Sequence, residues 1–243
     1  MTSLPSPRTA LALALGAGLV AGCATPRPLE NVDDSQIVGL DEFAERSTDG
    51  LWTADALLGL PVRGADGEEI GEVGNLVVGP DDRLRAMIIE VGGVLDIGDT
   101  HLRVPWTEIG ADPAELDLEY VDTNLASGDL ERYDAASNAP ADAGDKRREW
   151  RVDELLGDYV SLEDGTPRDY GIVRDVVFDG DRLESVVVNR SASYGGGLYN
   201  YPYRGYRAGY GFDPGLNDYR LGYGTGDLGG YGPFDYGTLG GPL

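Results

Sequence analysis

Few residues in this chain are suited to catalysis. His101 is the only histidine, and a lone histidine in a predicted strand is more often a surface or hydrogen-bonded residue than a general base. Cys23 is the only cysteine, and no Ser-His-Asp or Cys-His arrangement is indicated. No glycine-rich loop leads from a strand into a helix, as a phosphate-binding loop would. The sequence therefore predicts a protein that is not an enzyme and has no cofactor.

Oxygen ligands for a metal ion are more plentiful than nitrogen or sulfur ligands. Carboxylates cluster at Asp81-Asp82 and at Asp179-Gly180-Asp181, and calcium prefers such oxygens. Neither cluster has the spacing of an EF-hand loop, and Asp and Gly are common in turns between strands. We therefore expect turns and no metal site, with a calcium site as the alternative. Paired carboxylates could also cleave a glycosidic bond, but domains of about sixty residues leave little room for a sugar cleft.

Cys23 has a use outside catalysis. An apolar run over 10–20 precedes it, and this run is too short to span a bilayer, which takes roughly 20 residues. Residues 1–22 are therefore predicted to be a signal peptide. The segment Val20-Ala21-Gly22-Cys23 resembles the bacterial lipobox, which implies cleavage before the cysteine and a diacylglycerol on its thiol. Ala24 follows the cysteine, which by resemblance to the bacterial sorting pattern favours the outer membrane, with the protein facing the periplasm.

The charge of the chain narrows the choice of partners. The chain carries 43 acidic and 19 basic residues, a net charge of −24, and removal of 1–22 takes away only one basic residue. Such a charge repels the phosphates of nucleic acids and anionic lipid headgroups. We expect no nucleic-acid partner, and membrane contact only through the lipid on Cys23. Two explanations of the acidity stay open: a solvated surface, or adaptation to salt or to a cationic partner.

The chain contains an internal repeat. The pattern Trp-x-x-Asp-x-Leu-Leu-Gly occurs at 52–59 and again at 150–157. Later residues match in the same order: Val62 with Val160, Asp66-Gly67 with Asp164-Gly165, Gly71 with Gly171, Val73 with Val173, and Arg83-Leu84 with Arg182-Leu183. Small insertions in turns, with the order of elements kept, are what a repeated fold tolerates. We therefore predict a tandem duplication.

Each copy is expected to begin with one helical turn, followed by short strands. In the first copy Thr53 caps the turn 54–58, and Gly59 ends it in the left-handed conformation. Strands are predicted at 61–63, 69–78, 83–91, 101–106 and 116–120, with a hairpin turn at 64–67, a bulge at 74–75 and a polar helical segment at 124–133. Consecutive apolar residues at 87–89 mark 83–91 as a strand covered on both faces. Short strands with a bulge are typical of a small barrel.

The first copy resembles a known family, the PRC-barrel domain. The resemblance rests on Ala-Leu-Leu-Gly-Leu-Pro-Val at 56–62, Asp-Gly-Glu-Glu-Ile-Gly-Glu-Val at 66–73, Gly-Gly-Val-Leu-Asp-Ile-Gly-Asp at 92–99 and Val-Pro-Trp at 104–106. The family takes its name from the photosynthetic reaction-centre H subunit and includes the C-terminal domain of a ribosome-maturation factor. The resemblance implies a small barrel that docks other proteins rather than a catalyst. Neither context carries over, because the predicted export excludes a ribosomal role and no spanning helix precedes the motifs.

The second copy departs from this pattern toward its end. It keeps the opening turn, the Asp-Gly hairpin and strands at 173–178 and 183–188, and Tyr201-Pro202-Tyr203 takes the place of Val-Pro-Trp. Gly195-Gly196-Gly197 replaces most of the third motif, and no closing strand is assigned. Ten of the fourteen tyrosines and sixteen of the 37 glycines lie from 194 onward, and glycine costs backbone entropy without adding a side chain. A disordered tail is therefore expected, with an aromatic binding tail as the alternative.

The chain is accordingly expected to be all-β, with two tandem small β-barrels. The predicted divisions are a signal peptide at 1–22, a lipidated tether at 23–50, a first PRC-barrel-like domain at 51–133, a linker at 134–148, a divergent second domain at 149–206 and a Gly/Tyr-rich tail at 207–243. The expected function is that of a membrane-anchored lipoprotein that docks an envelope protein. The alternative is binding of an envelope polymer, glycan or peptidoglycan, by the tail. The sequence leaves the partner and the oligomeric state open.

Overall fold

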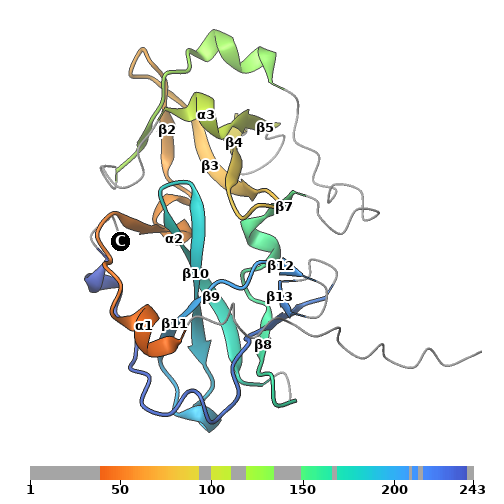
Figure 1. The fold of residues 1–243 in the computed structure, drawn as a ribbon. Helices are drawn as coiled ribbons and strands as arrows, with labels where there is room; N and C mark the ends of the chain where they lie inside the picture. Colours follow the sequence, from red (N-terminus) through yellow and green to blue (C-terminus); the bar gives the residue numbers. More distant parts are fainter. Residues whose placement is uncertain are drawn as a thin grey trace, which may run out of the picture. The chain divides into compact units, whose positions relative to one another are not determined.

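The fold is mostly β, in two sheets. The computed structural model describes residues 39–92, 100–110, 119–133, 149–165, 169–207, 210–212 and 216–239. These residues fall within one compact unit, Asp33–Leu243, and include three short α-helices (Figure 1). None of the helices in these ranges is long and apolar enough to cross a membrane. The signal peptide, Cys23 and the lipobox lie outside the described residues.

The first sheet is built from the first copy. Its strands are β2 (Pro61–Arg63), β3 (Glu69–Val78), β4 (Leu84–Val91), β5 (Thr100–Pro105) and β6 (Val121–Asp122), in the order β5-β4-β3-β2-β6. The strands predicted at 61–63, 69–78, 83–91 and 101–106 are confirmed, with two differences at their ends. Strand β4 begins at Leu84, and Trp106 already begins helix α3 (Trp106–Ile109). The predicted bulge is also confirmed, because the pairing of β3 with β4 shifts register between Val73 and Asn75.

The closing strand of the first sheet differs from its prediction. Residues 116–118 of the predicted strand lie outside the described residues. The strand that follows is β6, which runs parallel to β2 and places Val121 opposite Val62. The segment 124–133 contains a 3-10 helix, η3 (Ser127–Arg132), in agreement with its helical prediction.

The helical turn that opens each copy is anchored on the long strand that follows it. In the first copy α2 (Ala54–Leu57) starts at Thr53, whose Oγ1 accepts a hydrogen bond from the Ala56 N–H at 3.3 Å. Gly59 ends this turn at φ 81°, and its N–H donates to the Val73 carbonyl. In the second copy η4 (Val152–Glu154) is a 3-10 helix, and the N–H of Gly157 donates likewise to Val173. Gly59 and Gly157 therefore make the same backbone hydrogen bond in the two copies.

The second sheet extends far beyond the predicted second domain. Its strands are β8 (Tyr159–Ser161), β9 (Gly171–Asp179), β10 (Arg182–Arg190), β11 (Leu198–Pro202), β12 (Tyr206–Arg207), β13 (Tyr210–Phe212) and β14 (Asp218–Arg220), in the order β11-β10-β9-β8-β14-β13-β12. Pro202 of β11 lies opposite Ser185, as Pro105 lies opposite Ala86 in the first sheet. The remaining short helices are η5 (Ala192–Tyr194) and η6 (Tyr236–Thr238). The predicted boundary between 206 and 207 therefore cuts through one sheet.

The expectation of a disordered tail is wrong for the described residues 210–212 and 216–239. β14 runs parallel to β8 and places Tyr219 opposite Val160, as β6 places Val121 opposite Val62. Tyr219 is fully buried, and Leu221 and Tyr223 after it are also buried. Tyrosine rings thus supply core volume that a glycine-rich segment would otherwise lack, because each ring buries a large apolar area. The tail provides the strand that the second copy lacks in the sequence.

The leading strands of the two copies, β1 (Leu51–Thr53) and β7 (Trp150–Arg151), are exchanged between the sheets. β1 pairs with β9 of the second sheet, and β7 pairs with β3 of the first (Figure 1). Trp52 is fully buried and stacks on Phe178 with ring centroids 4.6 Å apart, and its Nε1–H donates to the Gly180 carbonyl at 2.9 Å. Each half therefore depends on the other for one strand.

Polar contacts at the bulges and turns reinforce this exchange. The Asn75 side chain accepts a hydrogen bond from the Asp153 N–H at 3.4 Å, and the Asp175 side chain accepts one from the Asp55 N–H at 3.2 Å. Each bulge residue thus caps the opening turn of the other half, since a side-chain oxygen there satisfies a free helix N–H. A single apolar cluster runs through both halves. The two copies share one core.

Neither sheet closes into a barrel among the described strands. The outermost strands β5 and β6 pair with β4 and β2 respectively and not with each other. β6 has only two residues, and each sheet gains instead the leading strand of the other half. The expected pair of closed barrels is therefore not found in the described ranges, because exchange of strands takes the place of closure.

The predicted tether is packed from residue 39 onward. Helix α1 (Leu40–Ala44) buries Leu40, which is 7% exposed, in the shared core. Arg46 forms an ion pair with Glu184, and the Thr48 hydroxyl donates to the Thr238 carbonyl at 2.6 Å. This segment therefore connects the second sheet with the end of the chain and belongs to the folded unit.

Candidate functional site

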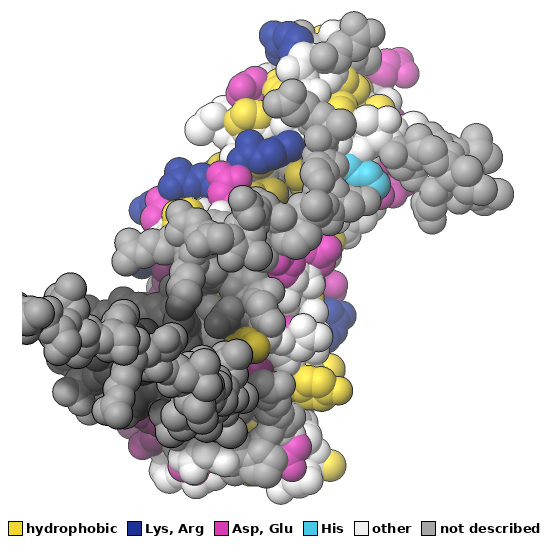
Figure 2. All heavy atoms as spheres, turned by 90° about the vertical axis from the view of Figure 1, so that its right-hand side faces the viewer, with side chains coloured by type: hydrophobic (Ala, Val, Ile, Leu, Met, Phe, Trp, Pro, Cys, Tyr) yellow, Lys and Arg dark blue, Asp and Glu magenta, His cyan; other side chains and the backbone are white. Residues whose placement is uncertain are grey.

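His101 lies on β5 directly opposite Glu90 of β4. Its Nε2 is 3.1 Å from a carboxylate oxygen of Glu90, and the His101 side chain is 30% exposed. On the face drawn in Figure 2, acidic and basic side chains are interspersed and form no single charged field. The structure thus gives His101 a surface partner of the ordinary cross-strand kind.

The two aspartate clusters lie in turns that join the halves. Asp81 pairs with Arg85 at 2.6 Å, and Asp181 pairs with Arg83. The carbonyls of Asp82 and Asp181 accept hydrogen bonds from Leu183 and Leu84 N–H groups across the junction. Within the described ranges, no group of three or more His, Cys, Asp or Glu side chains is arranged to hold a metal ion. Backbone hydrogen bonds between these two turns therefore hold the two hairpins together.

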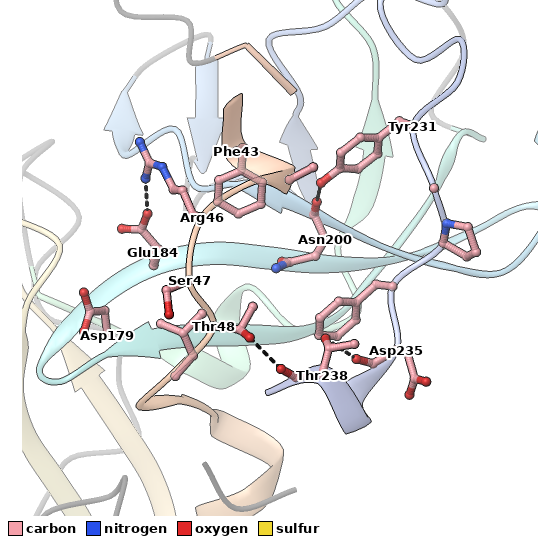
Figure 3. A pocket seen from close by; sticks show the side chains of 15 residues that line it. Phe43, Arg46, Ser47, Thr48, Asp179, Glu184, Asn200, Tyr231, Asp235 and Thr238 are labelled. Carbon is pink, nitrogen blue, oxygen red and sulfur yellow. Dashed lines mark hydrogen bonds and ion pairs between the residues drawn. The ribbon is translucent and has the colours of Figure 1, made fainter. Parts of the chain in front are cut away.

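A pocket of about 390 Å³ lies beside the second sheet, where the sequence predicted no site (Figure 3). Its walls come from the segment 43–51, from the turn end of β9 and β10 with Asn200 of β11, and from the segment 231–238. These segments are far apart in the sequence, and two of them were predicted to be a tether and a disordered tail. No local motif marks such a site, because it exists only once the three segments are packed together.

The pocket is acidic and aromatic. Asp179, Glu184 and Asp235 are among the residues that line it, and Arg46 is the one basic residue of the lining. Arg46 is already engaged, since it pairs with Glu184 and its Cζ lies 5.7 Å from the centre of the Phe43 ring. The Oδ1 atom of Asn200 is buried and has no hydrogen-bond partner among the described residues. The pocket lining thus combines acidic residues with the rings of Phe43, Tyr231 and Phe234.

Asp175 is a buried acid at the junction of the halves. It is fully buried, and burial raises its pKa from 3.8 to about 6, against the opposing effect of the N–H groups of Val176 and Asp55. Because the pKa of Asp175 is raised in the folded state, the protonated carboxyl contributes its full stability below pH 3.8. This contribution is lost as the pH rises through 6. At neutral pH the folded protein therefore holds a poorly solvated carboxylate.

Replacing Asp175 with asparagine is expected to stabilise the protein at pH 8 by about 1–3 kcal/mol, since one pKa unit corresponds to roughly 1.4 kcal/mol. Asparagine keeps the acceptor oxygen that caps the Asp55 N–H, as Asn75 does in the first half. Urea unfolding at pH 4 and pH 8 measures the effect, and the gain should disappear at pH 4. The matched control is Asn75→Asp, which should acquire the pH dependence. Equal destabilisation by Asp175→Asn at both pH values would contradict this account.

A second buried acid lies where the tail joins the sheet. Asp158 is 5% exposed, and burial, with the neighbouring Asp218, raises its pKa from 3.8 to about 7. Asp218 is the first residue of β14 and accepts a hydrogen bond from the Ser161 hydroxyl at 3.4 Å. The charge on Asp218 therefore acts on Asp158 where β14 pairs with β8.

The thermal midpoint of the protein is expected to fall as the pH rises from 4 to 7, because the folded state holds a proton on Asp158 that the unfolded state releases. The Asp158→Asn variant removes this titration and should show a flatter profile over the same interval. Thermal unfolding at half-unit steps of pH provides the measurement, with Asp153→Asn, an exposed acid of the same half, as the control. An unchanged slope in Asp158→Asn is the result that refutes the assignment.

Comparison with known proteins agrees with the architecture of the first sheet. The family model of the PRC-barrel domain matches residues 53–122. This span runs from Thr53, the cap of α2, to Asp122, the last residue of β6. No curated protein matches the chain. Residues 53–122 of this chain are therefore similar to the PRC-barrel domain family, as their motifs predicted.

Proposed function

We propose that this chain is a non-enzymatic envelope lipoprotein that docks another envelope protein through its PRC-barrel domain. The observation that carries the proposal is the family match over residues 53–122, because the resemblance to this family implies docking rather than catalysis. The described site residues are consistent with this role, since His101 pairs with Glu90 and the aspartate clusters join the halves. Docking then uses the outer surface of the first half.

We infer that the second half is a divergent copy of the same domain, in tandem with the first. Equivalent backbone hydrogen bonds support this inference. The Thr123 N–H donates to Arg63 and the Ala65 N–H to Leu125, and 98 residues later Leu221 donates to Ser161 and Glu163 to Tyr223. The copy is thus extended to residue 223, and the chain presents two related surfaces.

The lipid anchor is proposed from the sequence around Cys23. A Cys23→Ser variant is expected to move from the membrane fraction to the soluble fraction, because it has no thiol to carry a diacylglycerol and acyl chains gain about 0.8 kcal/mol per buried methylene. Fractionation of host cells followed by immunoblotting measures the shift. Ala24→Ser, which keeps the cysteine, is the control and should stay with membranes. A Cys23→Ser protein that remains membrane-bound would refute the anchor.

Polymer binding by the tail has less support. Stacking on a sugar needs exposed aromatic faces. Tyr219 and Tyr223 are buried in the core, and Tyr231 packs against that core. These rings are therefore engaged within the protein, and the docking proposal stands ahead of the polymer proposal.

The docking proposal is tested by site-specific photo-crosslinking in the native host. A crosslinking amino acid at Glu69 or Arg85, exposed positions on β3 and β4, is expected to capture one envelope protein reproducibly. The same group at Ile172 of the second sheet shows whether capture is specific to the first half. Capture should also weaken in Cys23→Ser, where the protein is displaced from the membrane. Absence of any discrete product at Glu69 and Arg85 would overturn the proposal.

A further inference from the structure

The pocket between segments 43–51 and 231–238 presents apolar side chains that are only half-buried. We propose that this pocket holds one fatty acyl chain, supplied by the lipid on Cys23. The inference goes beyond the docking role, because the pocket lies in the second half and outside the PRC-barrel match. It rests on the proposed lipid anchor for the source of the chain, and separate experiments test the site and that source.

The pocket has a continuous apolar wall. Phe43, Leu51, Tyr231 and Phe234 line it, and each of these side chains is half-buried. Leu51 and Phe234 also pack against a buried apolar cluster of the second sheet that is separate from the shared core. A ligand that covers such side chains gains free energy in proportion to the apolar area that it removes from water. The wall therefore favours a hydrocarbon ligand.

Polar side chains of the lining are engaged with other groups of the protein. Arg46 forms an ion pair with Glu184. The Thr48 hydroxyl donates to the Thr238 carbonyl at 2.6 Å. The Asp235 carboxylate accepts a backbone N–H at 2.9 Å, and Figure 3 shows it turned away from the cavity. A polar ligand would compete with these contacts, whereas a hydrocarbon chain leaves all of them in place.

The charge of the protein selects among hydrocarbon ligands. A free fatty acid carries a carboxylate, which the exposed Asp179 of the lining and the net charge of −24 repel. The acyl chains of a diacylglycerol are esters and carry no charge. The pocket therefore favours an esterified chain, such as those proposed on Cys23, over a free fatty acid.

The volume of the pocket suits a single chain. An engineered cavity of roughly 150 Å³ holds one benzene molecule, which has six carbon atoms. The pocket has a volume of about 390 Å³. On the benzene scale this volume accommodates about fifteen carbon atoms. One acyl chain of that length fills the pocket, so the other chains of the lipid stay available to the membrane.

Cys23 is close enough in the sequence to deliver its lipid. It lies 16 positions before Gly39, where the described chain begins, and Phe43 of the pocket follows shortly after. A flexible chain of 16 residues spans about 20–25 Å. A ligand on so short a linker has an effective concentration in the millimolar range, so a modest intrinsic affinity is sufficient. The protein's own lipid therefore has an advantage over a free lipid.

Titration with 1-octanol and 1-decanol tests the site in the absence of its own lipid. The protein is the Cys23→Ser chain without its predicted signal peptide. Isothermal titration should show saturable binding at one site, with decanol about fifteenfold tighter than octanol, because each of the two added methylenes contributes about fourfold. Decanoate, which is charged, should bind at least about tenfold more weakly than decanol. Absence of saturable binding, or equal binding of the two alcohols, overturns the site.

Variants of the lining locate the site. Ala44 lines the pocket and is exposed, so Ala44→Trp should occupy part of the cavity and weaken decanol binding about tenfold without disturbing the core. Phe43→Ser removes one ring of the wall and should weaken binding to a similar extent. The matched control, Leu216→Ser, removes an exposed apolar side chain outside the pocket and should keep the affinity. Equal weakening in this control would mean general adhesion to apolar surface and not binding in the pocket.

Photo-crosslinking in the native host identifies the source of the chain. Benzoylphenylalanine in place of Phe234 inserts into nearby C–H bonds, and mass spectrometry should find position 234 joined to the lipidated Cys23 peptide. The same amino acid in place of Tyr159, which is 53% exposed and lies outside the pocket, should give no such adduct. An adduct with a free phospholipid alone, or no lipid adduct, overturns the Cys23 lipid as the occupant. Failure of the anchor itself is recognised separately, because the wild-type protein would then leave the membrane fraction while decanol binding persisted.

Discussion

Replacing Trp52 with alanine is expected to destabilise the whole protein by about 3–5 kcal/mol, the usual cost of removing a buried large aromatic side chain. The ring stacks on Phe178 of the second sheet, and its centroid lies 6.1 Å from that of Trp106 in helix α3 of the first half. Its Nε1–H donates to the Gly180 carbonyl. Loss of the ring opens a cavity and leaves that carbonyl without its donor. Since domains are stable by about 5–15 kcal/mol, both sheets should unfold at a much lower urea concentration.

Far-UV circular dichroism in urea, compared with amide hydrogen exchange in each half, provides the measurement. Trp52→Phe is the matched control, because it keeps the stacking and loses only the indole hydrogen bond and some volume. Its cost should be smaller than that of Trp52→Ala. If Trp52→Ala left exchange in β9 and β10 unchanged, the exchange of strands would not couple the halves.

A chain that ends at Phe212 is expected to lose the fold of the second sheet. This truncation removes β14 with Tyr219, and also Leu221 and Tyr223, all of which are buried. Val160 of β8 would then be exposed, and the backbone of Ser161 and Glu163 would lose hydrogen bonds to the removed segment. Removal of two buried tyrosines and a leucine costs on the order of the total stability of a small domain.

A chain that ends at Leu239 is the control for this truncation, because it keeps every described element of the tail. It should unfold at the same urea concentration as the full chain. The chain that ends at Phe212 should show lost near-UV circular dichroism and rapid proteolysis between 149 and 207. If the chain that ends at Phe212 unfolded as cooperatively as the full chain, the tail would not be needed for the fold. The disordered tail predicted from composition would then be correct.

Local chemistry carried the sequence-based predictions that the structure confirms. Thr53 and Gly59 bracket α2 because one side-chain oxygen caps a helix and one residue without a Cβ accepts φ 81°. The apolar run Met87-Ile88-Ile89 is buried within β4, as its lack of alternation predicted. The bulge near Asn75 follows from the phase slip of apolar residues. Each of these features depends on neighbours within a few residues.

The predictions that the structure contradicts failed because they concerned contacts between distant segments. Residues 39–50 and 216–239 were assigned to a tether and a disordered tail because their composition is polar or rich in glycine. Leu40 and Tyr219 nevertheless lie in the core, since the second half leaves apolar surface that only these distant segments cover. Whether a tyrosine in a glycine-rich segment is buried depends on the surface it meets and not on its neighbours in the chain. The pocket was missed for the same reason.

The sequence by itself determined the β content, the turns and the repeated opening motif, because propensity, caps and apolar periodicity act over a few residues. Its motifs also indicated the similarity of residues 53–122 to the PRC-barrel domain. Only the tertiary structure decided that β1 and β7 change places, that Asp175 is buried and that β14 completes the second sheet. Strand pairing over such sequence distances depends on which surfaces remain uncovered after the local elements form, and no local pattern encodes it.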